Sequence, residues 1–432
     1  MRLKGIIIVF FIILVQAASA QDVLTLEQAV SKALSKNYDI QISRNNADIN
    51  KVNNTAGNAG MLPGVTISAT DSYSKIDLAQ KLSNGTDINK SNASANNLSS
   101  SAALGWTVFD GFKMFVTKRK LSEIEKLGEI QFKEQVIQTV YDVTVAYYNL
   151  VKQKQQLASL QEVINYNRER VKILQTSFSA GLTAKNNLLQ AKIDLNVFSE
   201  NAMNQQTLIL GARRNLNGLL NQPPETMYEV TDSIPIAELP AKDTILQKLY
   251  DNNLTLLSFR KQSEIAKLSI GEFNALRYPR ITFNSNYNFN QTNNSAGYQL
   301  YNRTLGPQVG GTISIPVFQG GNNVRQAKVA RLQYNASMYN VDKTSLNLRI
   351  ALQNAISDFE NQKQLLNIEL DNDALAKENL DISLQRLKLG QTTELEVKLA
   401  EESYVDSRTR LINFMYNVKV AETRLKQLMA EL

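Results

Sequence analysis

The chain lacks the two side chains that most often carry enzyme chemistry, because its 432 residues include no histidine and no cysteine. The missing imidazole removes the commonest general base and metal ligand, and the missing thiol removes zinc thiolates, disulfides and a lipid-anchored cysteine. Carboxylates remain open as catalytic groups, but no convergent set of them stands out. The sequence therefore predicts no catalytic residue, no metal ligand and no cofactor, and it argues against an enzyme.

The polar groups that do follow a strict spacing are amides and hydroxyls in the stretch Ile281–Asn290. Asparagine or threonine occupies every even position, and four of the five odd positions are apolar or aromatic. Successive side chains of a strand point to opposite faces, so one face would be apolar and the other almost entirely amide. A half-buried strand of a soluble protein also alternates, but strands of about ten residues with an apolar outside and a polar inside are typical of transmembrane barrels.

The same alternation occurs four times, which predicts two copies of one unit. Strands are expected at residues 62–74 and 101–109, and again at 279–290 and 308–318. Pro63 and Pro279 precede the first strand of each copy, a spacing of 279 − 63 = 216. Val-Phe-Asp-Gly from Val108 and Val-Phe-Gln-Gly from Val317 end the second strands, a spacing of 317 − 108 = 209.

The alternation also predicts which residues share a face. The candidates for the lipid-facing side are Trp106, Phe283, Tyr287, Phe289, Ile313 and Ile315. The candidates for the lumen-facing side are Thr66, Ser68, Thr70, Asn284, Asn286, Asn288, Thr312 and Ser314.

Long helices follow each strand pair. Residues 112–180 contain no proline and a single glycine, and residues 322–389 contain neither, so each predicts a helix on the order of 100 Å. Gly181 and Gly390 reverse the chain, because glycine accepts a left-handed backbone cheaply. Each copy also opens with a helical segment, Leu24 to about Gly60 and Thr244 to Leu276, and the polar stretches Lys75–Leu98 and Gln291–Arg303 are expected to be loops.

The N-terminus is typical of an export signal. Arg2 and Lys4 precede an apolar run, and Ala18-Ser19-Ala20 is a small-residue cleavage site, which predicts a signal peptide at residues 1–20. The domains are then a first repeat at 21–222, a connector at 223–243 and a second repeat at 244–432. The net charge falls from +7 to 45 − 40 = +5 without Arg2 and Lys4, and the basic residues are scattered along helices, so no nucleic-acid partner is expected.

Four strands cannot close a barrel, and an open edge in lipid would leave backbone groups unpaired. Several chains must therefore share one barrel. Two chains would give eight strands, whose interior side chains nearly fill, and three would give twelve, which can leave a passage. The long helices would project from the membrane as a column.

The duplicated strand–strand–long-helix unit, the two Val-Phe-x-Gly strand ends and the two glycine reversals resemble the TolC-like outer membrane efflux proteins over essentially the whole mature chain. The resemblance implies a mainly α-helical chain with a membrane β-barrel. It implies a homotrimer with a twelve-stranded barrel in outer membrane lipid and an α-helical tunnel in the periplasm. It also implies a passive conduit that receives substrate from a periplasmic adaptor (membrane fusion) protein and an inner-membrane transporter. Drug efflux and protein secretion both fit, and the alternative is a periplasmic coiled-coil adaptor or scaffold without a barrel.

The resemblance further implies a periplasmic tip that closes near the reversals. The tip and gate candidates are Gly181, Leu182, Asn187, Leu387, Gly390, Thr392 and Glu396. Leu387, Thr392 and Asn187 stand where the best-known family pattern has charged or phenolic partners. The expectation is therefore a neutral gate, held by packing and uncharged hydrogen bonds, with no exposed ion pair that salt could screen.

Overall fold

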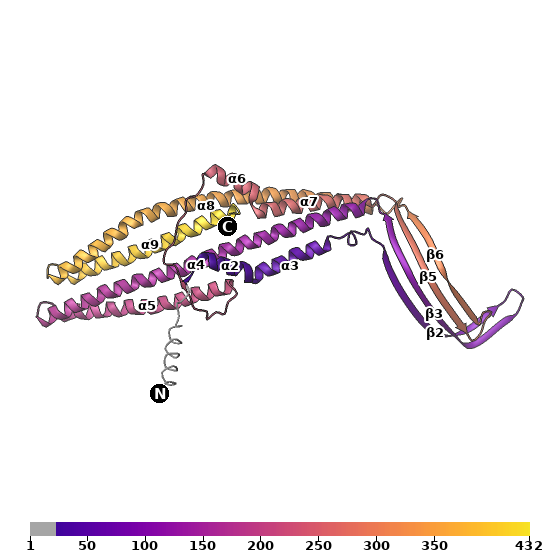
Figure 1. The fold of residues 1–432 in the computed structure, drawn as a ribbon, viewed down its shortest axis with the longest axis horizontal. Helices are drawn as coiled ribbons and strands as arrows, with labels where there is room; N and C mark the ends of the chain where they lie inside the picture. Colours follow the sequence, from indigo (N-terminus) through magenta and orange to yellow (C-terminus); the bar gives the residue numbers. More distant parts are fainter. Residues whose placement is uncertain (1–22) are drawn as a thin grey trace, which may run out of the picture. The chain divides into compact units, whose positions relative to one another are not determined.

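The computed structural model describes residues 23–432, so the predicted signal peptide and its cleavage site lie outside the described residues. The chain divides into two compact units. The first contains the described part of residues 1–45 with residues 131–257 and 343–432, and the second contains residues 46–130 and 258–342. The described part of the first unit consists of helices, turns, the connector between Leu219 and Lys242, and the two-residue strands β1 (Val23–Leu24) and β4 (Glu229–Val230), which pair in parallel. The second unit carries a four-stranded sheet and the helix segments next to it (Figure 1).

The two halves of the chain carry the same elements in the same order. The first half has α2 (Leu26–Lys36), α3 (Tyr38–Asn53), β2 (Gly64–Lys81), β3 (Asp87–Phe109), α4 (Lys113–Ser179) and α5 (Lys185–Leu219). The second half has α6 (Lys242–Asn252), α7 (Leu254–Ala275), β5 (Arg280–Asn294), β6 (Tyr301–Ser314), α8 (Asn322–Lys388) and α9 (Glu394–Leu428).

Matching helices have equal lengths. Helices α4 and α8 have 67 residues each, and α5 and α9 have 35 each. Both pairs are offset by the spacing found at the strand ends, 322 − 113 = 209 and 394 − 185 = 209. Helices α2 and α6 have 11 residues each and are offset by 242 − 26 = 216, as are β2 and β5 at 280 − 64 = 216. At 1.5 Å per residue, α4 and α8 each rise about 100 Å.

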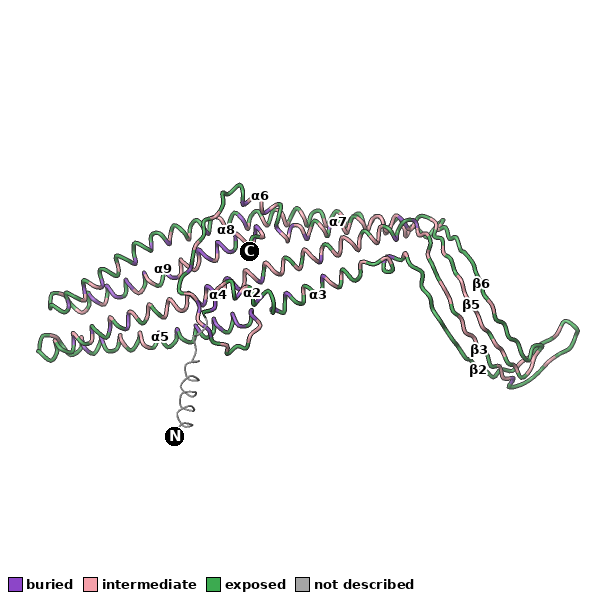
Figure 2. The backbone as a smooth tube through the Cα atoms, viewed as in Figure 1, coloured by how far each residue is buried: buried purple, intermediate pink, exposed green. Residues whose placement is uncertain are grey.

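The sheet is antiparallel throughout, in the order β2-β3-β5-β6. The two hairpins, one from each half, therefore meet between β3 and β5, and β2 and β6 are the edge strands. Most residues of β2 and β6 are exposed, whereas buried residues gather along the helices (Figure 2).

The expected loop at Lys75–Leu98 is wrong. Strand β2 continues to Lys81 and β3 begins at Asp87, so only residues 82–86 turn the chain. Likewise β5 runs to Asn294 and β6 begins at Tyr301, which shortens the expected loop at Gln291–Arg303. Polar composition misled the prediction, because an antiparallel pair satisfies its backbone groups whatever the side chains carry.

Each helical half of the first unit has its own hydrophobic core. One core joins α2, α4 and α5 around Tyr147, Leu216 and Leu220, and the other joins α6, α8 and α9 around Leu249, Leu352 and Leu425. All six residues are 2% exposed or less. The Tyr147 hydroxyl donates to the Leu24 carbonyl at 2.9 Å, which anchors the start of the described chain.

The N-terminal helical segment of each half is two helices rather than the single one expected, and a buried asparagine lies at each break. The Asn37 side chain donates to the Leu219 carbonyl at the end of α5 (2.9 Å) and accepts the Asp39 amide at 2.9 Å. Asn253 repeats this 216 residues later, since it donates to the Leu428 carbonyl at the end of α9 (3.0 Å) and accepts the Leu256 amide (3.0 Å). Each asparagine thus caps one helix and satisfies the last turn of another.

Among residues 23–432, no helix is both long and apolar enough to cross a lipid bilayer.

Replacing either buried asparagine by alanine should destabilise the first unit, because one cap and one carbonyl contact are lost together. We expect Asn37→Ala or Asn253→Ala to lower the unfolding free energy by about 1–3 kcal/mol. Thermal melting of the purified protein in detergent, followed by helical circular dichroism, measures this. Asn45→Ala, on the exposed side of α3, is the matched control. Equal melting temperatures for Asn37→Ala and Asn45→Ala would contradict the double role.

Candidate functional site

The strand register brings the predicted polar positions onto one face of the sheet, because directly paired residues of neighbouring strands share a face. Thr66 pairs with Ala103, which pairs with Asn286, and Ser68 pairs with Ser101, which pairs with Asn288. The Ser68 and Ser101 hydroxyls lie 3.0 Å apart, which confirms that these two side chains point the same way. Thr70, Asn284, Thr312 and Ser314 fall on this polar face by the same pairing.

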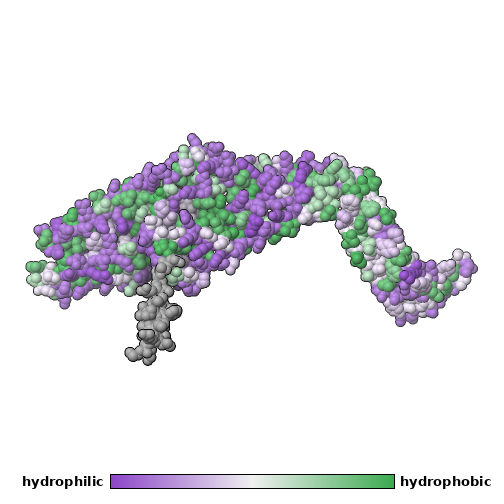
Figure 3. Space-filling model, in the orientation of Figure 1, coloured by the Kyte–Doolittle hydropathy of each residue, from purple (hydrophilic) through white to green (hydrophobic). Residues whose placement is uncertain are grey.

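The opposite face collects the predicted aromatic and aliphatic residues. Trp106 pairs with Phe283, Ala102 with Tyr287, and Ile281 with Ile313. Phe289, paired with Ser100, lies on the same face and contacts the Arg303 guanidinium at 5.3 Å from its ring centroid. Hydrophobic residues are dense over the part of the sheet next to the ends of α4 and α7 (Figure 3).

One of these expectations needs correcting. Strand β6 ends at Ser314 rather than at residue 318, so Ile315 lies beyond the sheet. Its counterpart Trp106 stays in a strand because β5 pairs with it, whereas the outer edge of β6 has no partner strand within the described chain. The orientation of either face toward lipid or lumen remains a prediction.

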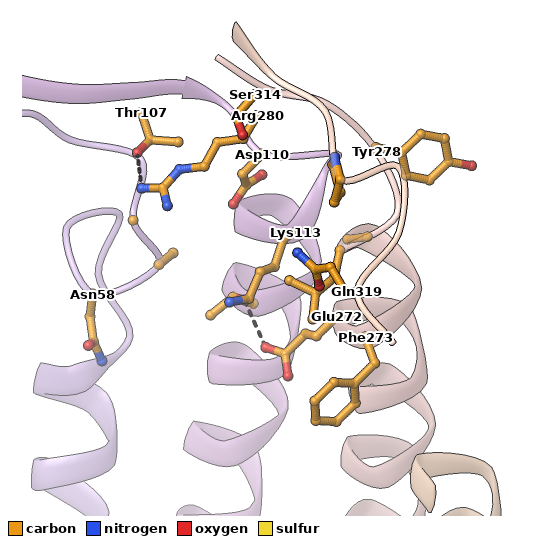
Figure 4. Close-up of a pocket in the computed structure, with 16 residues that line it drawn as sticks. Asn58, Thr107, Asp110, Lys113, Glu272, Phe273, Tyr278, Arg280, Ser314 and Gln319 are labelled. Carbon is orange, nitrogen blue, oxygen red and sulfur yellow. Dashed lines mark hydrogen bonds between the residues drawn. The ribbon is translucent and has the colours of Figure 1, made fainter. Parts of the chain in front are cut away.

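A cavity of about 670 Å³ opens where the polar face meets the helices of the second unit (Figure 4). Strand ends supply Thr107, Arg280 and Ser314, and the start of α4 and the end of α7 supply charged groups. The labelled residues around it are Asn58, Thr107, Asp110, Lys113, Glu272, Phe273, Tyr278, Arg280, Ser314 and Gln319.

The charged groups of this cavity differ in how they are engaged. Both oxygens of Asp110 accept the Met114 amide, at 3.1 and 3.0 Å, so this carboxylate caps the first turn of α4. Glu272 accepts the Thr117 hydroxyl and the Lys120 ammonium, each at 2.7 Å. Among the described residues, Arg280 donates only to the Thr107 hydroxyl, at 3.1 Å.

The strand-to-helix turn beside the cavity requires glycine. Gly111 has φ +74, and an added Cβ would lie 2.4 Å from the Ala275 carbonyl oxygen and 2.7 Å from the Tyr278 Cβ. The backbone of the first repeat therefore packs directly on the end of α7 from the second repeat.

In the first unit, the two helical hairpins reverse as predicted. Gly181 (φ +73) and Gly390 (φ +71) take left-handed conformations. At each reversal the backbone closes with the same pair of bonds, Leu182 N to Ser177 O (2.8 Å) with Gly181 N to Phe178 O (3.0 Å), and their counterparts at Gly390. This Schellman arrangement satisfies the last carbonyls of α4 and α8.

The predicted tip residues have different environments. Leu387 is 8% exposed and packs with Leu380 and Val397, whereas Leu182 is 80% exposed. The Asn187 side-chain amide donates to the Thr183 hydroxyl at 3.1 Å, at the start of α5 in the same hairpin. These contacts are uncharged, as expected.

The expectation that the tip holds no exposed ion pair is wrong. Arg386 donates to Glu396 at 2.5 Å across the second reversal, and both side chains are nearly half exposed. Thr392 also donates to Glu396. The prediction considered only the positions of the family's known partners, whereas the cation here is Arg386, the residue before Leu387 at the end of α8.

A buried charge cluster above the tip was missed entirely. Arg170 of α4 is 1% exposed and donates to Asp194 of α5 at 2.5 Å and to Glu401 of α9 at 2.7 Å. Glu394 lies 3.9 Å away, and Asn167 donates to Glu401 at 2.5 Å. The cluster therefore joins the two hairpins of one chain.

One signal could have found this pair. Arg170 lies 181 − 170 = 11 residues before the first glycine reversal, and Glu401 lies 401 − 390 = 11 residues after the second. Helical residues at equal distances from two matching turns lie at the same level. The sequence distance of 231 residues hid the contact.

The same helices carry a second set of polar links. The Tyr166 hydroxyl donates to Asp381 at 2.8 Å, and Glu162 accepts both Lys377 (2.7 Å) and the Tyr404 hydroxyl (2.8 Å). Burial alone would raise the pKa of Glu162, but the Lys377 ammonium and the Tyr404 hydroxyl bring it below its ordinary value. At Glu401 burial prevails over the Arg170 charge and raises the pKa.

Taken together, a duplicated chain with a two-faced antiparallel sheet and long reversed helical hairpins defines the class of outer membrane channel-tunnels. The chain belongs to the outer membrane efflux protein family, whose model matches residues 29–222 and 245–431. Its setting is accordingly the cell outer membrane.

Two relatives of known name match most of the chain. The outer membrane protein TolC of Escherichia coli is 21% identical over 353 residues, covering 78% of this chain and 70% of TolC. The alkaline protease secretion protein AprF of Pseudomonas aeruginosa is 22% identical over 382 residues, covering 86% of this chain and 77% of AprF.

Solved structures share the fold. The outer membrane protein VceC of Vibrio cholerae superposes with a TM-score of 0.76 at 16% identity, over 94% of this chain and 96% of VceC. CusC superposes with a TM-score of 0.77 at 18% identity, over 94% of this chain and 91% of CusC.

Removing the cation from the buried cluster should leave uncompensated carboxylates in the first unit. We expect Arg170→Met to cost about 3–5 kcal/mol, against about 0–1 kcal/mol for Lys242→Met, whose partner Glu360 is exposed. The Glu401 pKa is already raised, and a raised folded-state pKa contributes stability at low pH that is lost as the pH rises through it. The deficit of Arg170→Met should therefore grow as the pH rises above the ordinary carboxyl range, as measured by melting temperature. A pH-independent deficit would contradict this account.

Proposed function

We propose that three copies of the chain form one channel-tunnel, with a shared twelve-stranded β-barrel in the outer membrane and a helical tunnel in the periplasm. The observation that carries the proposal is the four-stranded sheet with one apolar face, one polar face and two edge strands without partners in the described chain. The channel is a passive conduit and has no catalytic step. Drugs, small toxic molecules and secreted polypeptides are the candidate substrates, and protein secretion figures in the name of the AprF relative.

The physical reason for sharing a barrel is the cost of an open edge in lipid. Each unpaired backbone group in the hydrocarbon region costs several kcal/mol, so β-structure spans a membrane only when it is closed. Four strands are too few to close, and three identical sheets give twelve. A periplasmic adaptor or scaffold would account for the helices but would have no use for an apolar face on the exposed sheet.

The duplication supplies a template for the contact between copies. Within the chain, β3 of the first half pairs with β5 of the second half, and β6 and β2 are their counterparts at spacings of 209 and 216. Because Gly105 pairs with Asn284, Ser314 of one copy should pair with Ser68 of the next. Ile313 should pair with Ala69 by the same rule. Polar residues then meet polar residues and apolar residues meet apolar ones, so both faces continue around the ring.

The exposed residues beyond β6 support the same contact. Val317 and Phe318 are 92% and 85% exposed, whereas Val108, the counterpart of Val317, is 47% exposed and Phe109, the counterpart of Phe318, is half-buried. Gly320 has φ +60 with nothing near its Cβ position, although its counterpart Gly111 packs on Ala275 and Tyr278. The counterparts of those two residues, 216 positions earlier, are Ala59 and Leu62; Ala59 is buried at 5% exposure, whereas Leu62 is 61% exposed. Bare apolar surface of this kind marks a protein or membrane contact.

We also propose that the hairpin reversals form the periplasmic mouth, where a periplasmic adaptor docks and an inner-membrane transporter delivers substrate. The small or polar residues Thr183, Asn187 and Thr392 around the exposed turns allow close approach of partner helices. Gly181, Leu182 and Gly390 form the turns at which an adaptor would dock. Leu387 and the Arg386–Glu396 pair would contribute to closure, and salt would weaken the half-exposed ion pair.

The register between copies can be tested by cysteine crosslinking, since the chain has no cysteine of its own. We expect the double variant Ser68→Cys/Ser314→Cys to form dimers and trimers linked by disulfides on oxidation, because directly paired Cα atoms lie within disulfide range. Thr66→Cys/Ser314→Cys is the matched control, displaced by two residues on the same face to about 7–8 Å. Stronger crosslinking of the control would show another register. A monomer in mild detergent with neither crosslink would contradict the shared barrel itself.

The orientation of the faces can be tested with two neighbouring residues of β5. Arginine at a lipid-facing site near mid-membrane costs about 2–4 kcal/mol, whereas a lumen-facing arginine keeps its water. We therefore expect Tyr287→Arg to lower the unfolding free energy by this amount and Asn288→Arg to change it little. Urea unfolding of the protein in lipid vesicles provides the measurement. The reverse order of the two variants would mean that the amide face meets lipid.

A further inference from the structure

The polar face of the sheet carries almost no fixed charge. Over the paired positions of β2 from Gly64 to Ser74 and of the three other strands beside them, its side chains are amides, hydroxyls, alanines and glycines. Arg280, paired with Ser314 at the base of β5, is the one ionisable residue among these positions. The opposite face carries charges of both signs, namely Asp71, Lys75 and Arg303.

The Arg280 side chain is held over the cavity at the base of the polar face. Its guanidinium donates to the Thr107 hydroxyl of the neighbouring strand β3 at 3.1 Å, and the residue is exposed (Figure 4). Lys113, the first residue of α4, also lines this cavity. Neither cation forms an ion pair with any carboxylate of the described chain.

The acidic residues of the cavity do not cancel these charges locally. Asp110 caps α4 through the Met114 amide, where the positive end of the helix dipole compensates it. Glu272 is paired with Lys120 at 2.7 Å. The cavity therefore holds two unpaired cations beside two compensated carboxylates, so its local field is positive.

We propose that Arg280, supported by Lys113, makes the base of the barrel select anions, so that small anionic molecules are the favoured class of solute. This inference rests on the proposed function, because the polar face must line a lumen. Closure of the sheet would place one Arg280 per copy on the wall of the passage. A ring of arginines selects anions in pores, and low-dielectric walls focus its field. With an otherwise uncharged wall, nothing nearby opposes this preference.

The acidic candidate at the tip does not supply an equivalent cation filter. Glu396 is paired with Arg386 at 2.5 Å, so its charge is compensated within the chain. The unpaired cations at the cavity should therefore dominate the sign of the selectivity.

Ion selectivity in planar bilayers tests this inference on the full-length purified protein. Reversal potentials in a potassium chloride gradient should show a chloride-to-potassium permeability ratio above one for the wild type. Arg280→Gln should lower the ratio to one or below, Lys113→Gln should lower it less, and Arg280→Lys should keep it above one. Arg303→Gln is the matched control, because it removes the same charge from the same sheet but from the opposite face, and it should leave the ratio unchanged.

The outcomes separate the inference from the function on which it rests. A wild-type ratio at or below one would overturn the inference even if Arg280→Gln failed to assemble. An unchanged ratio in Arg280→Gln, or an equal change in Arg303→Gln, would also overturn it while leaving the channel intact. Absence of conductance from the wild type and all the variants would overturn the channel, and the inference with it.

Discussion

The structure depends on the need of every strand edge to find a partner. Strands β2 and β6 each offer a row of backbone donors and acceptors that no other strand of the described chain satisfies. In water such an edge invites aggregation, and in lipid it costs several kcal/mol for each group. The apolar face of the sheet would be unfavourable in permanent contact with water. The cost of an open edge is the physical reason for our proposal that several copies share one closed barrel, and the chain has the fold of known channel-tunnels.

The duplication of the chain gives a way for the edge strands to find partners. Each half supplies one hairpin, and the junction between β3 and β5 already joins the end of the first half to the start of the second. In the proposed assembly, the same kind of junction would be repeated from β6 to the next copy and would form a ring without any new type of contact. The halves nevertheless differ in two ways. Strands β2 and β3 are longer than β5 and β6. Gly111 packs against Ala275 and Tyr278, whereas Gly320 has no neighbouring atom near its Cβ position. The first difference lies in the hairpins, and the second is expected if the counterpart of the β3–β5 junction forms only between copies.

The helical unit satisfies its buried polar groups in a different way. The buried asparagines Asn37 and Asn253 donate to carbonyls at the ends of neighbouring helices, and Arg170 forms ion pairs with carboxylates from two other helices. Such groups are costly to bury, so they are tolerated only where their partners are fixed. Each asparagine fixes helices within its own half, whereas Arg170 holds the two hairpins of one chain in a defined alignment near the reversals.

The sequence by itself determined the elements and their order. Period-two alternation fixed the two faces, the spacings of 216 and 209 revealed the duplication, and the absence of proline predicted the two 67-residue helices between their glycine ends. These features are local or repeat at a fixed distance, so one chain contains all the information. The strand ends could not be predicted, because β2 and β3 extend through polar residues on backbone pairing alone, and Ile315 falls outside β6 for want of a partner. Only the tertiary structure decided the Arg170 cluster and the Arg386–Glu396 pair. The sequence places Arg170 and Glu401 at equal distances from their reversals, but which helices lie side by side and which faces they turn to each other is set by packing rather than by any local pattern.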